Sequence, residues 1–395
     1  MTQSTTLPIR NRMFRTLTTF TLLCLAAVTA AAQPERLQRP IWKAVVEADR
    51  EHELLRSYES PAGTWMLAYA KPAGEYMSTE KTTELIGFDA NGAELARIDL
   101  DTLFAGKDVV RFHDLAVLAD RTIAVFATNG GEELFAYIVD PNLNRIVSGM
   151  RLGSTRRTHY ISDVVPAEDG RFLVVGRSNA RGWMMKLDAK LAIRWDKTFD
   201  DEKMTVFHDA SVRPDGSIAA VGGQLLPTGV TNIWVGEITT DGQVAARVMF
   251  PGREATIATE GGRVAVSYDV KGAGGWDVFV RGYGPGLREE WITPLTSGLR
   301  LPREFRIAAG PGDTWVVAGA TKEKKLGVTA LGTGGAPLWN WTSPVENDFW
   351  EMLWNVGDLQ LRGPDVVVPY TLLTLDDADR QVQRIRLIKL PLRAQ

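Results

Sequence analysis

Residues 168–176 read EDGRFLVVG, and residues 214–222 read PDGSIAAVG. Each stretch is a turn followed by a short apolar strand that ends at a small residue. The turn position recurs at intervals of 46 to 58 residues, at Ala62, Asp120, Asp169, Asp215, Gly261, Gly312 and Gly363. Units of short strands cannot each bury a core alone, so they must pack side by side. The repeat therefore predicts an all-β fold, a seven-bladed β-propeller.

The second half of each unit repeats as well. Residues 183–188 (WMMKLD) lead through a turn to residues 193–196 (IRWD), and residues 328–331 (VTAL) lead to residues 338–341 (LWNW). Outer strands of neighbouring blades need apolar side chains, and a Trp N–H finds a partner at the rim. We therefore expect Trp195 to belong to the core, with a cost of about 3–5 kcal/mol for Trp195→Ala.

The last unit lacks its fourth strand, because it stops at residues 385–390 (IRLIKL). An unassigned strand lies at the other end of the chain, in residues 40–45 (PIWKAV). Trp42 precedes the turn at Ala62 by 20 residues, just as Trp195 precedes the turn at Asp215. The spacing predicts that residues 40–45 pair with the final blade, which closes the ring and protects its edge.

The N-terminus reads as a secretion signal. Three arginines precede an apolar stretch from Leu17 to Ala32 that ends in three alanines. This pattern predicts a signal peptide at residues 1–32 and a single β-propeller domain at residues 33–395, with translation starting at Met1 or at Met13. The apolar stretch is shorter than a membrane span, and no second one follows. We expect an exported, secreted chain, periplasmic or extracellular, with no integral membrane segment after cleavage.

Composition narrows the chemistry. The only cysteine, Cys24, lies inside the predicted signal, behind the large Leu23 that disfavours a lipid anchor. The mature chain then has no disulfide, thiolate metal site or cysteine nucleophile. The formal net charge is −3, and loss of the three signal arginines makes it −6. The charges are mixed along the chain, so no nucleic-acid partner is expected.

These units resemble the propeller repeats of exported bacterial proteins, which follow the pattern D-G-G-Y-I-V-A-G and then L-D-x-x-G-x-x-x-W. The resemblance covers about the whole mature chain and is strongest between Asp163 and Phe250. It implies the propeller fold and leaves the activity open, because related propellers bind, scaffold or catalyse. The Trp-docking pattern of quinoprotein propellers is not reproduced, which argues against a quinone cofactor.

The candidate chemistry lies six residues before the turn, where three consecutive units carry an aspartate. Two of these aspartates sit in the tripeptide Phe-His-Asp, and a third histidine lies just upstream of the remaining one, beside Tyr160. The strand starts should gather these side chains at one mouth of the channel. The candidate channel-mouth set is His113, Asp114, His159, Asp163, His208 and Asp209. Such a cluster could hold a divalent metal or supply an acid and a base.

A structural alternative stands beside this hypothesis. Neighbouring residues on a strand point to opposite faces, so His113 and Asp114 serve one site only outside a regular strand. The repeat also places an acidic residue at this position in ordinary propellers, where it accepts backbone N–H groups between blades. We expect this structural role for the aspartates, and we expect His52 to be a solvated loop residue.

Two functions remain. The first is a non-enzymatic binding or scaffold module for a protein or glycan partner, using the long loops at residues 71–83, 225–231 and 269–276. The second is a propeller hydrolase or lyase that uses the His and Asp cluster. No cofactor is predicted for the chain, although the cluster of the second function is compatible with a divalent metal. No G-x-S-x-G motif, calcium loop or sialidase Asp-box is complete in the sequence. The sequence indicates neither the ligand nor the oligomeric state.

Overall fold

The computed structural model describes residues 40–392 except for residues 47–49, 61–62, 73–80, 118–121, 130–132, 141, 143, 153–158, 168–169, 180, 200–205, 226–230, 273–274, 296–304, 313, 322, 345–351 and 376–380. The chain divides into two units, residues 1–36 and 37–395, and every described residue belongs to the second unit. The predicted signal peptide and its cleavage site lie outside the described residues.

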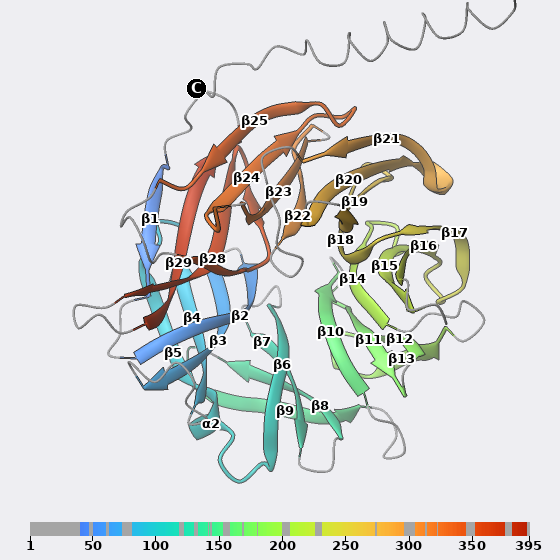
Figure 1. Cartoon of the computed structure of the whole chain (residues 1–395). Helices are drawn as coiled ribbons and strands as arrows, with labels where there is room; N and C mark the ends of the chain where they lie inside the picture. The colour runs from blue at the N-terminus through green and yellow to red at the C-terminus, as the bar shows by residue number, and fades with distance from the viewer. Residues whose placement is uncertain are drawn as a thin grey trace, which may run out of the picture. The chain divides into compact units, whose positions relative to one another are not determined.

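The second unit is a seven-bladed β-propeller (Figure 1). Seven antiparallel sheets surround a central channel, and the first strands of successive blades contact one another in a closed cycle. The predicted fold class is therefore confirmed. No helix in the described part of the chain is long and apolar enough to span a membrane.

The strands of each blade follow one another from the channel outward. Blade 1 has β2 (Arg50–Ser60), β3 (Gly63–Pro72), β4 (Thr82–Asp89) and β5 (Glu94–Asp99), followed by the short helix α2 (Leu100–Leu103). Blade 2 has β6 (Val109–Val117), β7 (Ile123–Asn129), β8 (Leu134–Asp140) and β9 (Arg145–Leu152). Blade 3 has β10 (His159–Pro166), β11 (Phe172–Ser178), β12 (Arg181–Leu187) and β13 (Ile193–Thr198). Blade 4 has β14 (Val206–Val212), β15 (Ile218–Leu225), β16 (Thr231–Ile238) and β17 (Val244–Pro251).

The remaining blades keep this order. Blade 5 has β18 (Arg253–Glu260), β19 (Arg263–Gly272), β20 (Gly275–Gly284) and β21 (Arg288–Pro294), with the 3₁₀ turn η1 (Pro285–Leu287) before its last strand. Blade 6 has β22 (Arg306–Gly310), β23 (Thr314–Ala320), β24 (Leu326–Leu331) and β25 (Pro337–Thr342). Blade 7 has β26 (Met352–Val356), β27 (Gln360–Arg362), β28 (Asp365–Leu375), β29 (Gln381–Pro391) and β1 (Trp42–Val45).

The N-terminal strand closes the ring, as the Trp spacing predicts. β1 pairs antiparallel with β29, with Trp42 opposite Lys389 and Val45 opposite Arg386. In Figure 1 the blue β1 lies beside the red β29. The outermost strand of the last blade is thus supplied by the beginning of the domain, which covers an edge that β29 would otherwise expose.

The core consists of apolar side chains between adjacent blades. Within the described residues, each of the seven blade interfaces has its own cluster, for example Phe126 with Phe172 and Trp183 between blades 2 and 3. Middle strands such as β11 and β12 are buried on both faces, which accounts for their continuous apolar runs. Burial of each large apolar side chain contributes about 1.5–3 kcal/mol.

The recurring glycine of the repeat has a conformational reason. Gly170 and Gly216 lie in the turns after the first strands of blades 3 and 4, with φ of 73° and 79°. Only glycine adopts this left-handed conformation without strain, so the turn selects it. The motif that identifies the repeat is thus the connection between the first and second strands.

Two expectations about single residues need correction. His52 is not a solvated loop residue: it lies on β2, is 1% exposed, and its Nε2 is 2.9 Å from Glu84 Oε2. Trp195 lies on β13 and is only half-buried, although its Nε1 donates to Thr240 O of blade 4 at 3.0 Å, which is the rim bond expected. The fully buried tryptophan of this blade is Trp183.

Candidate functional site in the central channel

The strands that line the channel share a local irregularity. The first strands of blades 1 to 5 and of blade 7 each carry a β-bulge, for example between Phe207 and Asp209 in β14. A bulge places two residues opposite one and interrupts the alternation of side chains. His208 and Asp209 consequently both line the same cavity, although they are neighbours on a strand. The regular alternation of strand side chains is thus interrupted at His208 and Asp209, whereas neither His113 nor Asp114 lines this cavity.

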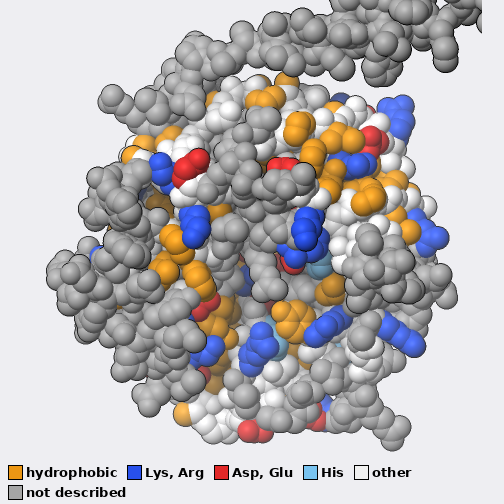
Figure 2. Space-filling view, viewed as in Figure 1, with side chains coloured by type: hydrophobic (Ala, Val, Ile, Leu, Met, Phe, Trp, Pro, Cys, Tyr) orange, Lys and Arg blue, Asp and Glu red, His pale blue; other side chains and the backbone are white. Residues whose placement is uncertain are grey.

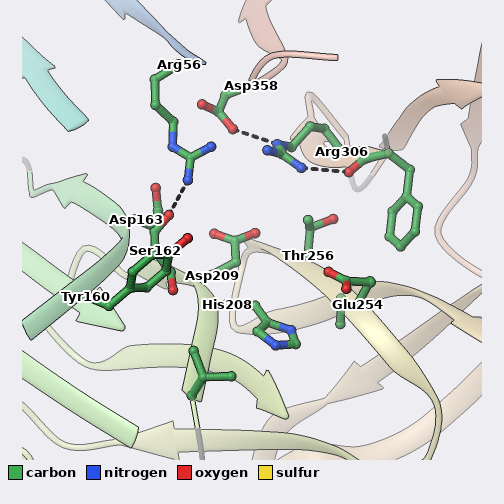
Figure 3. Close-up of a pocket in the computed structure, with 13 residues that line it drawn as sticks. Arg56, Tyr160, Ser162, Asp163, His208, Asp209, Glu254, Thr256, Arg306 and Asp358 are labelled. Carbon is green, nitrogen blue, oxygen red and sulfur yellow. Dashed lines mark hydrogen bonds and ion pairs between the residues drawn. The ribbon is translucent and has the colours of Figure 1, made fainter. Parts of the chain in front are cut away.

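The channel contains two cavities separated by a ring of charged side chains. A cavity of about 450 Å³ lies toward the start of the first strands, and one of about 170 Å³ lies on the other side. Both are lined by Asp163, Asp209, Arg306 and Asp358, which we call the channel waist. Figure 3 shows these four side chains projecting into one space. Asp163 and Asp209 thus lie in the middle of β10 and β14 rather than at the strand starts.

Asp114 forms a buried cluster with two residues of blade 1. Its Oδ1 accepts the N–H of Leu115 at 2.9 Å and the hydroxyl of Tyr58, and its Oδ2 lies 3.6 Å from Arg56 Nε. Burial raises the pKa of Asp114 to about 8, because the loss of solvent outweighs the attraction of Arg56. Arg56 also donates to the carbonyl of Ser162, so this cluster joins blades 1, 2 and 3.

Asp209 holds two neighbouring blades together. Its Oδ1 accepts the N–H of Ala210, and its Oδ2 accepts the N–H of Ile257 on β18, both at 2.8 Å. Burial raises the pKa of Asp209 well above its usual value, and the charge of Asp163 raises it further. Burial and the charge of Asp358 likewise raise the pKa of Asp163, which is hydrogen-bonded to Asp209. These two carboxyl groups therefore retain protons more readily than exposed ones.

The opposite side of the waist is an ion pair. Arg306 Nε lies 3.0 Å from Asp358 Oδ1, and its NH1 donates to the carbonyl of Phe305 at 3.1 Å. Asp358 lies in the break between β26 and β27, and its backbone carbonyl accepts the hydroxyl of Ser57. The break directs an acidic side chain into the channel where a regular strand would continue.

The three histidines of the candidate set have different surroundings. His208 lines the cavity, and burial lowers its pKa while Glu254 partly raises it. His113 Nε2 lies 3.1 Å from Thr128 Oγ1, and burial lowers its pKa to about 4. His159 is 6% exposed, and its ring packs on Trp183 with centroids 4.5 Å apart. Only His208 of these histidines faces the cavity.

The structure thus brings together part of the predicted set. Asp163, His208 and Asp209 line the larger cavity, and Asp114 contacts Arg56, which also lines it. His113 and His159 pack elsewhere. Sequence reasoning missed Arg56 and Arg306, although both lie six residues before a turn in their own units. It also missed Glu254 and Asp358. The residue six before the turn is Ala255 in blade 5 and Gly357 in blade 7, and the two acidic residues are the direct neighbours of these positions.

The mouth of the larger cavity carries an exposed aromatic ring. Tyr160 lines the cavity and is 39% exposed. The guanidinium groups of Arg111 and Arg177 lie 5.7 and 5.2 Å from the centre of its ring. Figure 2 shows Lys or Arg side chains next to histidine near the middle of the propeller face. The mouth of the larger cavity is therefore basic and aromatic, whereas the channel waist is rich in carboxyl groups.

The divalent metal allowed by the sequence finds no assembled site in the described part of the chain. No group of three or more His, Cys, Asp or Glu side chains there is arranged to hold an ion. A metal at the His and Asp cluster therefore stays a prediction, to be tested by metal analysis.

Comparisons with known proteins support the fold. Neither a scan of protein-family models nor a search of curated proteins finds a match. Among solved structures, the chain is similar to the Dos1 propeller, with a TM-score of 0.56 and 11% identity over 91% of this chain and 97% of that chain. Prolyl oligopeptidase B from Galerina marginata (TM-score 0.49, 12% identity, 88% and 51% covered) and the propeller domain of the Trilobed protease from Pyrococcus furiosus (0.49, 9%, 84% and 97%) also match.

The similarity to the Dos1 propeller concerns the architecture alone, because the identity is 11%. The fold and the channel define the protein as a seven-bladed β-propeller with a polar central channel. The finer resemblance to exported bacterial repeats stays a prediction.

Proposed function

We propose that the protein is an exported binding module whose channel cavity holds part of a glycan. The observation that carries this proposal is the 450 Å³ cavity lined by carboxyl and guanidinium groups, with the exposed ring of Tyr160 at its mouth. Ligand sites of this size combine a few placed polar groups with apolar surface. Planar carboxyl and guanidinium groups can each bond two adjacent hydroxyl groups, and an aromatic ring covers the apolar face of a sugar.

The lining favours a hydroxyl-rich ligand over an ionic one. Arg56 is engaged by Asp114 and Ser162, and Arg306 is engaged by Asp358. Both guanidinium groups are thus already engaged inside the protein, while the oxygen atoms of the waist still line the cavity. A neutral polar chain can exchange hydrogen bonds with such a surface without burying a new charge, which would be costly.

The proposal is tested by screening the mature chain against immobilised neutral and acidic oligosaccharides. We expect wild-type protein to bind at least one glycan and Tyr160→Ala to lose at least tenfold in affinity with an unchanged melting temperature. Ile193→Ala is the matched control, because Ile193 is exposed on the outer strand of the same blade. Absence of glycan binding, or equal loss in both variants, would refute the proposal.

A protein partner is the other form of the binding hypothesis. It would use the loops at residues 71–83, 225–231 and 269–276, parts of which lie outside the described residues. A stable protein interface needs about 800 Å² on each partner. A channel cavity lined by Tyr160 and the waist cannot offer such a flat area, so the described residues favour the glycan.

The second candidate is a hydrolase or lyase, and a specific observation favours it. Asp209 has a strongly raised pKa and lines one cavity with Glu254 and His208. A carboxyl group that stays protonated can act as a general acid, and a nearby carboxylate or imidazole can act as a base. Incubation of each bound glycan with wild type and Asp209→Asn decides the matter. Cleavage that falls at least 100-fold in the variant while binding persists would establish the enzyme, and metal analysis of the same sample shows whether an ion participates.

A further inference from the structure

A side pocket adjoins the channel cavity between blades 4 and 5. It has a volume of about 250 Å³ and is lined by residues of β14, β15, β16 and β18. It shares Val206, His208 and Glu254 with the channel cavity, so the two spaces lie side by side. Figure 3 shows the His208 ring on the channel side, in the same part of the cavity as Asp209 and Glu254.

Two buried polar atoms in this lining have no hydrogen-bond partner among the described residues. One is Oε1 of Gln224, a residue that is 4% exposed, and the other is Nδ1 of His208. Buried polar atoms in folded proteins are almost always paired. An unpaired amide oxygen and an unpaired imidazole nitrogen in the lining of one pocket therefore indicate a ligand that supplies hydrogen-bonding groups.

The charge state of the lining defines the ligand class. Burial lowers the pKa of His208, so its imidazole is neutral at neutral pH, with one nitrogen able to donate and the other to accept. Gln224 is an uncharged amide. Gly223 leaves room for the imidazole, because a Cβ there would lie 3.2 Å from His208 Nε2. Of the charged residues that line the pocket, Arg253 is paired with Asp269 at 3.4 Å, and Glu254 can accept hydrogen bonds. The unpaired atoms of His208 and Gln224 thus favour a neutral group that both donates and accepts.

We propose that the side pocket binds one neutral sugar ring, with a ring hydroxyl donating to Gln224 Oε1 and another bonded to His208 Nδ1. This inference rests on the proposed glycan function and assigns the blade 4–5 pocket as the subsite for a terminal unit. The volume lies below that of pockets for drug-sized ligands, which begin at about 300 Å³, so it suits a single ring. The rest of the glycan continues past His208 into the channel cavity.

The test uses glucose, galactose, xylose and N-acetylglucosamine as free probes, measured by ligand-observed NMR, together with the best-binding oligosaccharide measured by calorimetry. Gln224→Leu keeps the size of the side chain and removes the acceptor. We expect it to weaken binding of at least one monosaccharide and of the oligosaccharide by tenfold or more, with an unchanged or higher melting temperature. Gln224→Met repeats the test if the first variant does not fold.

The control is Gln243→Leu, the same change at an exposed turn residue of blade 4, which should bind as wild type does. If Tyr160→Ala abolishes oligosaccharide binding while Gln224→Leu retains full affinity, the side-pocket inference is overturned and the channel proposal stands. If wild-type protein binds no saccharide, both are overturned. Loss of binding in Gln224→Leu but not in Gln243→Leu supports the subsite.

Discussion

The aspartates of the channel combine two roles at the level of single residues. Asp209 accepts backbone N–H groups from its own blade and from the next, as expected of a structural residue, and it also faces the cavity. Asp114 is 0% exposed and is held by Tyr58 and Arg56. The scaffold therefore fixes Asp209 where a ligand can reach it from the cavity, whereas Asp114 is enclosed by its partners.

The raised pKa of Asp114 predicts a pH dependence of stability. Its pKa is about 8 in the folded state, compared with an ordinary value of 3.8. Between these two pH values the folded state binds more protons than the unfolded state, so the free energy of unfolding falls as the pH rises toward and through 8. His113 has the opposite effect, because burial lowers its pKa from 6.5 to about 4. Its contribution to the free energy of unfolding is present above pH 6.5 and is lost as the pH falls toward 4. Between pH 6.5 and 8.5 we expect the deprotonation of Asp114 to lower the free energy of unfolding by about 2 kcal/mol.

Denaturant unfolding at these two pH values measures the effect. The decline should be smaller in Asp114→Asn, because the amide has no proton to lose. Asp277→Asn, an exposed change on β20, should decline as wild type does. An equal decline in Asp114→Asn would mean that this carboxyl group does not titrate as described.

Two tryptophans of blade 3 give a paired prediction. Trp183 is fully buried, and its Nε1 donates to Asp196 Oδ1 at 2.6 Å, whereas Trp195 is half-buried. Trp183→Ala should cost about 3–5 kcal/mol, the range first expected for Trp195, and Trp195→Ala should cost roughly 2 kcal/mol. Denaturant unfolding compares them, and an equal or larger loss at Trp195 would contradict the burial difference.

The strands show why the fold was predictable and the site only partly so. Turn glycines, apolar runs and the Trp spacing are local signals, and they gave the seven units and the pairing of β1 with β29. The waist depends on interruptions that leave no clear local signal, namely the bulges and the break that places Asp358. Reading the position six residues before every turn would have added Arg56 and Arg306. The partners Tyr58 and Ile257 appear only when blades meet in space.

Deletion of residues 33–48 tests the closure by β1. The change removes the pairing with β29 and the buried Val46, whose N–H donates to Ile385 O at 3.0 Å. We expect destabilisation of the entire domain, because the apolar face of β29 would be exposed. Deletion of residues 33–38, which spares β1, should have no such effect. Equal melting temperatures for the longer deletion and the full mature chain would disprove the closure.

At the scale of the whole molecule, seven blades surround a polar central channel. Each described blade interface is apolar, whereas the channel gathers ionisable side chains from several blades. Buried polar groups of this kind cost stability unless they are satisfied, and the binding role proposed above accounts for their concentration in the channel. The frame itself does not define that role, since many functions share the propeller fold.

The most direct test of the glycan proposal is a crystal structure of the mature chain with the oligosaccharide that binds best in the screen. The account predicts electron density for sugar in the 450 Å³ cavity, with one ring against Tyr160 and hydroxyl groups within hydrogen-bond distance of Asp163, Asp209 or Glu254. Density for sugar only on the outer strands, or an empty channel at saturating ligand, would contradict it.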